Sequence, residues 1–188
     1  MDRNTDTDSK RKSVSDAIVF LREGFLNVII NYMGFFDLFR EKKVYEGEIV
    51  DLRERYRVSA KQAYDGIATV YYEILKHEDK HKVGTIDLRL SAAQGDMYYY
   101  GNVGYNVQKE ERGNSYAYYA CKVLFRIAKE EFGMHELIIT CSPENEASYR
   151  TLMKLNGELL ELVEVPARHL LYTLGEKTKY IFRYRIDL

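Results

Sequence analysis

The sequence has only two cysteines, Cys121 and Cys141, and almost no net charge. Two cysteines predict no disulfide framework, so a reducing, cytoplasmic compartment is the simplest expectation. The 28 lysines and arginines balance 29 aspartates and glutamates, which gives a formal net charge of −1. Because no overall electric field would attract polyanions, we expect neither nucleic acid nor an anionic membrane among the partners.

Long apolar runs and a secretory signal are also missing. The most apolar stretch, residues 25–39, is interrupted by asparagine, glycine and aspartate and is too short to span a bilayer. Residues 1–13 are polar with no apolar segment behind them, so they predict a flexible tail rather than a signal peptide. With 46% hydrophobic residues in the chain, residues 14–188 predict a single domain with a substantial core.

Apolar periodicity divides this domain into helices and strands. Residues 14–41 predict an atypical N-terminal helical segment that is apolar on nearly every side over 25–39. Strands are expected at 47–56, 67–75, 82–90, 99–107, 137–141, 158–165 and 178–187, and helices at 115–132 and 144–155. This order predicts an α+β protein with α/β-like features: a mixed twisted sheet of about six to seven strands, a central strand–helix–strand (βαβ) crossover and flanking helices.

The stretch 107–117 leaves an apolar strand and enters a helix through Arg112 and Gly113. A helix N-terminus presents unbonded N–H groups and a partial positive charge, which suit a phosphate or diphosphate group. Gly113 would let such a ligand approach the backbone, and Arg112 adds a full positive charge. From these residues alone an ordinary turn is the alternative, because the common nucleotide-binding motifs do not fit.

Four segments carry a family resemblance. They are Tyr100-Gly-Asn-Val-Gly-Tyr-Asn-Val107, Arg112-Gly-Asn-Ser-Tyr-Ala117, Glu136–Ser148 and Lys154–Leu160. Together they resemble the GNAT family, the Gcn5-related N-acetyltransferases, and in particular its small bacterial members. The family pattern Arg/Gln-x-x-Gly-x-Gly/Ala is matched except that Ser115 replaces a glycine, and Asn145 and Ser148 match the second pattern, Asn-x-x-Ser. The likeness covers about residues 67–188.

The resemblance implies that the chain binds acetyl-CoA as a co-substrate, without a metal, and transfers its acetyl group to a primary amine by direct attack. It places the diphosphate at the start of the helix, the pantetheine arm along the preceding strand, and an asparagine on the other side of the arm. The residues that it assigns to coenzyme binding are Tyr105, Asn106, Val107, Arg112, Gly113, Asn114, Ser115, Tyr116, Ala117, Asn145 and Ser148.

This resemblance does not assign a catalytic base. Many GNAT relatives carry a glutamate where this chain has Asn102, and the tyrosine acid of some relatives falls at Leu152. An asparagine cannot act as a base, so Asn102 is expected to position a water molecule.

Further hydroxyl groups and carboxylates are candidates for the catalytic acid and base. The hydroxyl groups that would substitute for the missing acid are those of Tyr105, Ser148 and Tyr149. The nearest carboxylates on neighbouring strands belong to Asp87 and Glu73. An exposed or ion-paired structural role is the alternative for both carboxylates.

Other functions are weighed against this one. The absent glutamate and tyrosine favour a GNAT-fold protein that binds acyl-CoA without turnover and acts as a sensor or interaction module. His77-Glu-Asp-Lys-His81 spells the zinc-peptidase pattern H-E-x-x-H, but it falls in a predicted turn rather than on a helix. The 17 tyrosines suit aromatic packing better than a nucleic-acid stacking surface, because they are not interleaved with basic residues.

The segment 14–41 departs from the GNAT pattern, which places two helices between the first and second strands. It is expected to form the acceptor wall, to contact a second copy in a homodimer, or simply to cover one face of the sheet. The amine-bearing acceptor stays open among small antibiotic amines, polyamines, amino sugars and protein N-termini.

Overall fold

The computed structural model describes residues 42–63 and 65–186. The chain divides into two units, Met1–Glu41 and Lys42–Leu188, and all helices and strands of the described residues belong to the second unit. The predicted tail and the predicted helical segment 14–41, with the roles expected for it, lie outside the described residues.

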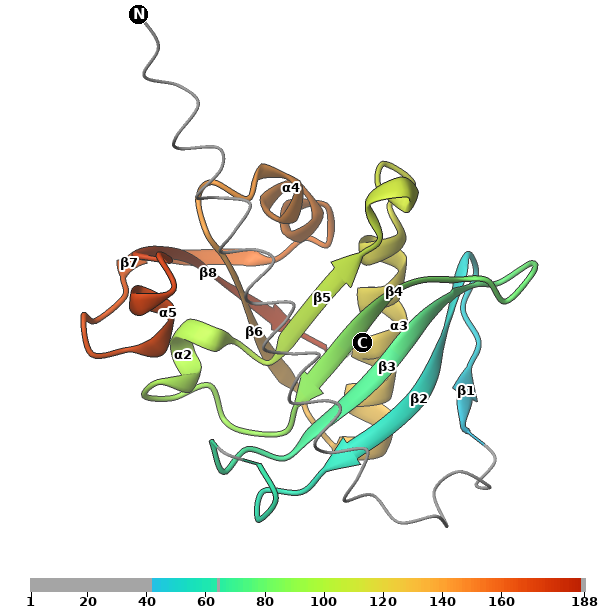
Figure 1. The fold of residues 1–188 in the computed structure, drawn as a ribbon, viewed down its shortest axis with the longest axis horizontal. Helices are drawn as coiled ribbons and strands as arrows, with labels where there is room; N and C mark the ends of the chain where they lie inside the picture. The colour runs from blue at the N-terminus through green and yellow to red at the C-terminus, as the bar shows by residue number, and fades with distance from the viewer. Residues whose placement is uncertain (1–41, 64, 187–188) are drawn as a thin grey trace, which may run out of the picture. The chain divides into compact units, whose positions relative to one another are not determined.

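Five strands form an antiparallel sheet in the order β1-β2-β3-β4-β5 (Figure 1). Their bounds are Val44–Tyr45 (β1), Val50–Val58 (β2), Thr69–Lys76 (β3), Lys82–Arg89 (β4) and Val103–Val107 (β5). Because each strand pairs with the one before it in the chain, this sheet forms by local antiparallel pairing.

Three further strands form a second antiparallel sheet in the order β6-β8-β7. Their bounds are Glu136–Cys141 (β6), Glu158–Glu164 (β7) and Thr178–Arg185 (β8). The helical segments are α2 (Met97–Tyr100), the 3₁₀ turn η2 (Lys109–Glu111), α3 (Tyr116–Phe132), α4 (Glu146–Lys154) and α5 (Leu170–Thr173). The chain passes from the first sheet to the second through α3, as the predicted crossover requires. No helix within residues 42–63 and 65–186 is long and apolar enough to cross a membrane.

One hydrophobic core joins α3 to the strands of both sheets. α3 contributes a stripe at helical spacing that includes Ala120, Leu124 and Ile127, all buried. The strands contribute alternate residues, which point to one face. These include Leu52, Tyr72, Ile74, Ile86, Leu88, Leu137, Ile139 and Phe182. The helix ends at Gly133, whose left-handed φ of 60° lets the chain turn into β6.

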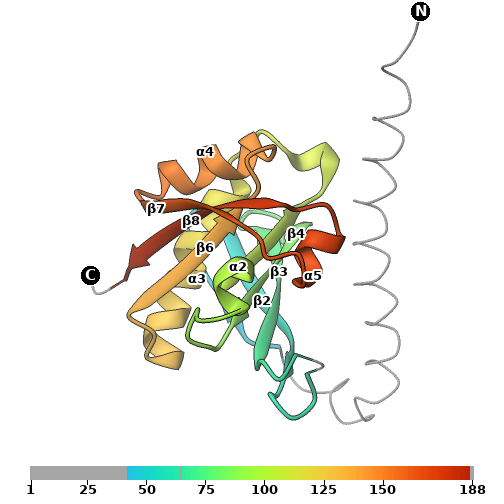
Figure 2. The same cartoon turned by 90° about the vertical axis from the view of Figure 1, so that its left-hand side faces the viewer.

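The short helices α2 and α5 lie side by side (Figure 2). His169, at the start of α5, joins them: its ring centre lies 5.2 Å from that of Tyr99 and 4.7 Å from that of Tyr100. Its Nε2 lies 3.1 Å from the C=O of Asp96, and its Nδ1 accepts the N–H of Leu171. These contacts tie the β7–β8 connection to the segment that leads into β5.

All seven expected strands are present, and the described part of the chain adds the two-residue β1. Two details differ from the expectation. The strands form two sheets rather than one. The predicted strand 99–107 begins as the helical turn α2, and strand β5 starts only after Gly101, whose left-handed φ of 69° ends the helix.

Candidate functional site

The two sheets meet at Asn102, immediately before β5. Its backbone N–H donates to the C=O of Ile138 in β6 (2.6 Å), and its side-chain oxygen accepts the N–H of the same residue (2.8 Å). Its amide nitrogen donates to the C=O groups of Arg89 (3.1 Å) and Ser91 (2.7 Å). Asn102 is 2% exposed, so these bonds are shielded from water. We call this hydrogen-bonded junction of β5 and β6 the closed end.

These contacts favour a structural role for Asn102 over the catalytic role expected from the sequence. Both amide hydrogens and the side-chain oxygen serve neighbouring backbone groups, which leaves no amide hydrogen to orient a water molecule. The preceding Gly101 permits the close approach of the strands, since a Cβ there would lie 2.8 Å from the backbone oxygen of Ile138. Asn102 is therefore a joint between the sheets.

Beyond this joint, β5 and β6 diverge toward their C-terminal ends (Figure 1). Where β5 ends, the N–H of Gln108 donates to the C=O of Val83, just outside the ladder with β4. Because antiparallel bonding alternates along a strand, the N–H and C=O groups of Val103, Tyr105 and Val107 point away from β4. Since β5 is the last strand of its sheet, no further strand of the described residues pairs with these groups. We call these groups the open edge of β5.

The loop after β5 reaches the N-terminus of α3 through two left-handed residues. Gly113 has φ 89° and Ser115 has φ 59°. A Cβ placed on Gly113 would meet no atom within 4 Å, so the space around it is open. Within the described residues, no side chain caps α3 and no acidic residue lies in its first turn. The first N–H groups of α3 are thus available to an anion.

Two basic side chains lie at this N-terminus. Arg112 Nε donates to the C=O of Val107 (3.3 Å), so it links the loop to the open edge of β5. Lys154 Nζ, from the end of α4, donates to Ser115 Oγ (3.3 Å) and lies 4.4 Å from the centre of the Tyr118 ring. Sequence reasoning placed Arg112 at this point and missed Lys154, because no local pattern shows that the end of α4 returns to the start of α3.

The N-terminus of α4 is satisfied within the protein. Asn145 Oδ1 accepts the N–H of Ser148 (3.1 Å), and Glu146 lies in the first turn. A capping oxygen and an acidic residue are what a helix N-terminus needs in the absence of a ligand. The contact expected between Asn145 and a pantetheine arm would therefore use the amide nitrogen of this side chain.

The hydroxyl groups of Tyr105 and Ser148 are brought together from β5 and α4. Their oxygen atoms are 2.7 Å apart, and Ser148 is 8% exposed. Burial raises the pKa of Tyr105 above its ordinary value, so its hydroxyl is protonated at neutral pH. Tyr149, the third hydroxyl considered, packs its ring 5.0 Å from that of Tyr180. The structure thus pairs two of the three expected proton donors.

The two cysteines are buried core residues with free thiols. Burial raises the pKa of Cys121 to about 12 and that of Cys141 to about 11. Both thiols are therefore protonated at neutral pH, and a protonated thiol is a poor nucleophile.

The two carboxylates expected near the site are both ion-paired. Glu73, in β3, lies 2.8 Å from Arg53 Nη2 and 3.3 Å from Lys82 Nζ. Burial acts to raise the pKa of Glu73, but the hydrogen bond from Arg53 and the charge of Lys82 hold it below its ordinary value. Asp87, in β4, is 5% exposed, and one of its oxygens lies 3.0 Å from Arg89 Nη2.

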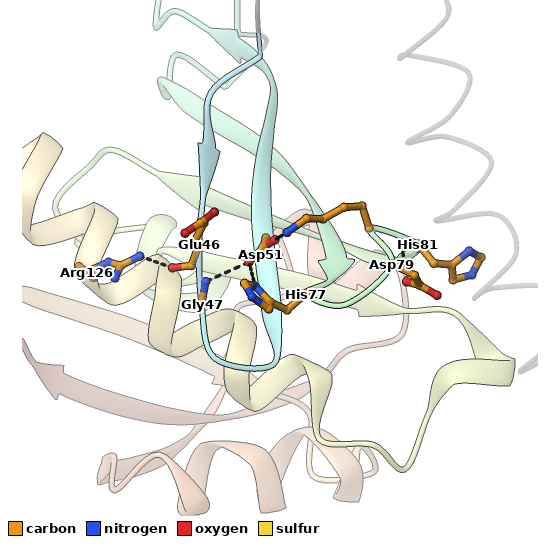
Figure 3. Close-up of polar contacts among 8 residues, drawn as sticks. Glu46, Gly47, Asp51, His77, Asp79, His81 and Arg126 are labelled. Atoms are coloured by element: carbon orange, nitrogen blue, oxygen red, sulfur yellow. Dashed lines mark hydrogen bonds and ion pairs between the residues drawn. The ribbon is translucent and has the colours of Figure 1, made fainter.

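The H-E-x-x-H segment forms the turn between β3 and β4, and its two imidazole rings do not converge (Figure 3). His77 Nδ1 lies 2.8 Å from Asp51, a fully buried carboxylate that also binds the N–H of Gly47 (3.0 Å) and the ammonium of Lys80. Burial acts to raise the pKa of Asp51, but these partners hold it below its ordinary value. The cluster anchors the turn to β2. Among residues 42–63 and 65–186, no group of three or more metal-ligating side chains is placed to hold an ion.

A cavity of about 630 Å³ lies at the closed end. Asn102, Ile138 and Met134 are among its lining residues. A second cavity, of about 170 Å³, lies between the β1–β2 turn and α3. Residues 103–117 line neither of these two cavities. The candidate site consists of the open edge of β5 and the N-terminus of α3.

The sequence profile of the acetyltransferase (GNAT) domain matches residues 35–158, which is more than half of the chain. The mixed α+β fold, with its crossover through α3, agrees with that assignment. The chain belongs to the GNAT acetyltransferase family. A comparison with curated proteins finds no match.

Solved GNAT structures share this fold at low sequence identity. A GNAT-family acetyltransferase from Bacillus anthracis is 15% identical with a TM-score of 0.56, over 78% of this chain and 100% of that one. Ribosomal-protein-S5-alanine acetyltransferase from Vibrio fischeri is 16% identical with a TM-score of 0.55, over 77% and 97%. RimL, a ribosomal L7/L12 α-N-protein acetyltransferase in complex with coenzyme A, is 11% identical with a TM-score of 0.55, over 77% and 99%. Identities this low establish a shared fold but not a shared acceptor.

Proposed function

We propose that this protein is an acetyl-CoA-dependent N-acetyltransferase that acts on a primary amine. The observation that carries the proposal is the uncapped N-terminus of α3 directly after the open edge of β5. One element offers N–H groups to a diphosphate and the other offers a strand edge to an amide-containing arm. Family membership supports acetyl transfer as the reaction class.

The fit to the coenzyme can be followed group by group. The diphosphate would take the N–H groups of residues 113–117, with the charge of Arg112 beside them. The two amides of the pantetheine arm would pair with the open edge over Tyr105 to Val107. The amide nitrogen of Asn145 would donate to the arm from the opposite side. Ser115 has the backbone N–H that the family's glycine provides, and its φ lies in the left-handed range that glycine favours.

Acetyl transfer to an amine needs three things: a neutral amine, stabilisation of negative charge on the carbonyl oxygen, and a proton for the departing thiolate. A backbone N–H of the open edge, at Tyr105 or Val107, would supply the second. The buried hydroxyl pair of Tyr105 and Ser148 would supply the third. The net reaction converts an alkylammonium and the thioester to an amide, free coenzyme A and one released proton.

A thiol-release assay on the purified full chain tests this function. Acetyl-CoA is mixed with spermidine, glucosamine, or a short peptide with a free N-terminus, and the N-acetylated peptide serves as the matched control. Because two of the structural relatives are named as ribosomal-protein acetyltransferases, the peptide is the first acceptor to try. We expect thiol release that depends on a free amine.

Two other results would overturn this function in different ways. Binding of acetyl-CoA without release for any amine would support the non-catalytic sensor. Absence of coenzyme binding would exclude both the enzyme and the sensor.

A further inference from the structure

The loop that leads into α3 carries two carboxylates immediately before Arg112. Glu110 and Glu111 both belong to the 3₁₀ turn η2. Under the proposed function a diphosphate would bind at residues 113–117, so a carboxylate this close in the chain would repel it. Glu110 is exposed, whereas the side chain of Glu111 is 17% exposed. Because water screens Glu111 less, its charge is the one that needs a partner.

Lys76, the last residue of β3, provides the counter-charge for Glu111. Its Nζ lies 3.1 Å from Glu111 Oε1. The hydrogen bond to Glu111 holds the pKa of Lys76 above its ordinary value, so the ammonium keeps its charge at neutral pH. His81 Nε2 lies 3.6 Å from the same oxygen, which is too far for a hydrogen bond.

The same ammonium group lies beside the start of α3. Lys76 Nζ is 5.9 Å from the centre of the Tyr116 ring, within the range of a cation–π contact, and Tyr116 is the first residue of the helix. Lys76 therefore reaches a residue on each side of the segment 112–115: Glu111 before it and Tyr116 after it. That segment contains the two left-handed residues that precede the helix N-terminus.

The backbone of Lys76 is held by the sheet and the turn that follows. Its N–H donates to the C=O of His81 (2.8 Å), and its C=O accepts the N–H of Lys80 (3.0 Å). It lies opposite Val50 in the ladder with β2. The turn after it is anchored to β2 through Asp51 (Figure 3). The ammonium thus reaches the loop from a hairpin that the proposed function leaves without a role.

We propose that Lys76 is a positioning residue for the coenzyme, because it neutralises Glu111 and so keeps the loop 112–115 attractive to a diphosphate. This inference rests on the proposed function and adds to it a residue of the β3–β4 hairpin that acts without touching the coenzyme. Since Lys76 acts through Glu111, the affinity for coenzyme A depends on the pair rather than on either charge alone.

Calorimetric titration of the full chain with coenzyme A tests this pair. We expect Lys76→Met to lower coenzyme A affinity about 10-fold at low ionic strength, because Glu111 is then uncompensated beside the diphosphate. Glu111→Gln should bind coenzyme A at least as tightly as the wild type, because the repelling charge is gone while Lys76 remains. The double variant of Lys76→Met and Glu111→Gln should return to within about threefold of the wild type.

Lys82→Met is the matched control for the loss of one positive charge. Lys82 lies on the same hairpin, and its Nζ is 3.3 Å from Glu73, a carboxylate of β3 rather than of the loop. Its side chain is 37% exposed, close to the 29% of Lys76. Because its charge already has a partner outside the loop and is screened by water, Lys82→Met should change coenzyme A affinity by less than about twofold.

The double variant separates this role from two others. If Lys76 were only a structural tether for the loop, or if it bound the diphosphate itself, the double variant would stay as weak as Lys76→Met. Pantetheine adds a second readout, because it lacks the diphosphate and should bind equally well to Lys76→Met and to the wild type. Lys76→Gln takes the place of Lys76→Met if that variant does not fold.

A wild type that binds coenzyme A no better than Lys76→Met does would overturn this inference and leave the proposed function standing. A double variant without recovery, or a Lys76→Met variant that loses affinity for pantetheine as well, would overturn it in the same way. A wild type that binds no coenzyme A would overturn the proposed function, and the role of Lys76 with it.

Discussion

The two ends of the β5–β6 pair are built in opposite ways. At the closed end, Asn102 uses its backbone and its whole side chain to bond β6 and the end of β4, and it is nearly inaccessible to water. At the open end, the strands diverge, and the N–H groups of the open edge and of the α3 N-terminus are without internal partners among the described residues.

The difference shows how one pair of strands can provide stability at one end and unpaired backbone groups at the other. A buried backbone group without a partner costs stability, so free N–H groups are kept where water or a ligand reaches them. The closed end joins the strands before they diverge, and the open end leaves backbone groups for the coenzyme that we propose. Substitutions at the closed end should therefore act on stability, and those at the open end on binding or turnover.

The largest effect is expected at the closed end. Asn102→Ala removes the partners of two part-buried backbone C=O groups and one buried N–H, and each loss costs about 1–3 kcal/mol. We expect the free energy of unfolding in urea to fall by about 3 kcal/mol or more. The control is Asn106→Ala, at an exposed residue of the following strand, which should change the free energy of unfolding by less than about 0.5 kcal/mol. Equal losses in both variants would remove the distinction between the ends.

A charge reversal at the open end should lower coenzyme A affinity and leave stability nearly unchanged. Arg112 is exposed, and its contact is with the backbone of Val107, so Arg112→Glu should leave unfolding nearly unchanged. Coenzyme A affinity should fall about 10- to 100-fold, the scale of a charge-assisted hydrogen bond of about 1.5–3 kcal/mol. Arg150→Glu, on the exposed side of α4, is the matched control and should bind coenzyme A like the wild type. A loss of stability rather than of affinity in Arg112→Glu would contradict this division of roles.

Substitutions of the paired hydroxyl groups of Tyr105 and Ser148 should change turnover alone. Tyr105→Phe and Ser148→Ala are each expected to lower kcat about 10-fold at unchanged coenzyme A affinity, and the double variant should cost little more than either one. Because burial raises the pKa of Tyr105, its proton stays in place above pH 10, where an exposed tyrosine has lost half of it. The wild-type kcat should thus show no decline from this group up to about pH 10. Fully additive losses would argue against a shared proton path.

The smallest effect is expected from Asn145, which combines both roles. Asn145→Asp keeps the oxygen that caps α4 and loses the amide nitrogen, so stability should be unchanged within about 0.5 kcal/mol while coenzyme A affinity falls a few-fold. Asn145→Ala loses the cap as well and should cost about 1 kcal/mol of unfolding free energy. Identical affinities in Asn145→Asp and the wild type would confine this residue to capping.

The strand and helix order could be predicted from the sequence because it depends on local periodicity. The stripe of α3, with Gly133 after it, and the alternation in β8 are examples. The junction between the two sheets could not be predicted, because it depends on one side chain, Asn102, bonding across a large sequence separation. Nothing in the residues around Asn102 distinguishes such a joint from an ordinary strand position.

The candidate site was predictable to a similar degree. The loop 112–117 followed from a glycine and an arginine between strand and helix. The contacts of Lys154 with Ser115 and of Lys76 with Glu111 are tertiary, so periodicity could not reveal them.

Calorimetric titration of the full-length wild-type chain with coenzyme A, and in parallel with pantetheine, tests the central claim most directly. If the open edge and the α3 N-terminus hold the coenzyme together, coenzyme A should bind with measurable heat. Pantetheine, which lacks the diphosphate, should then bind at least about 10-fold more weakly. Equal affinities for the two ligands, or no heat with coenzyme A, would contradict the account.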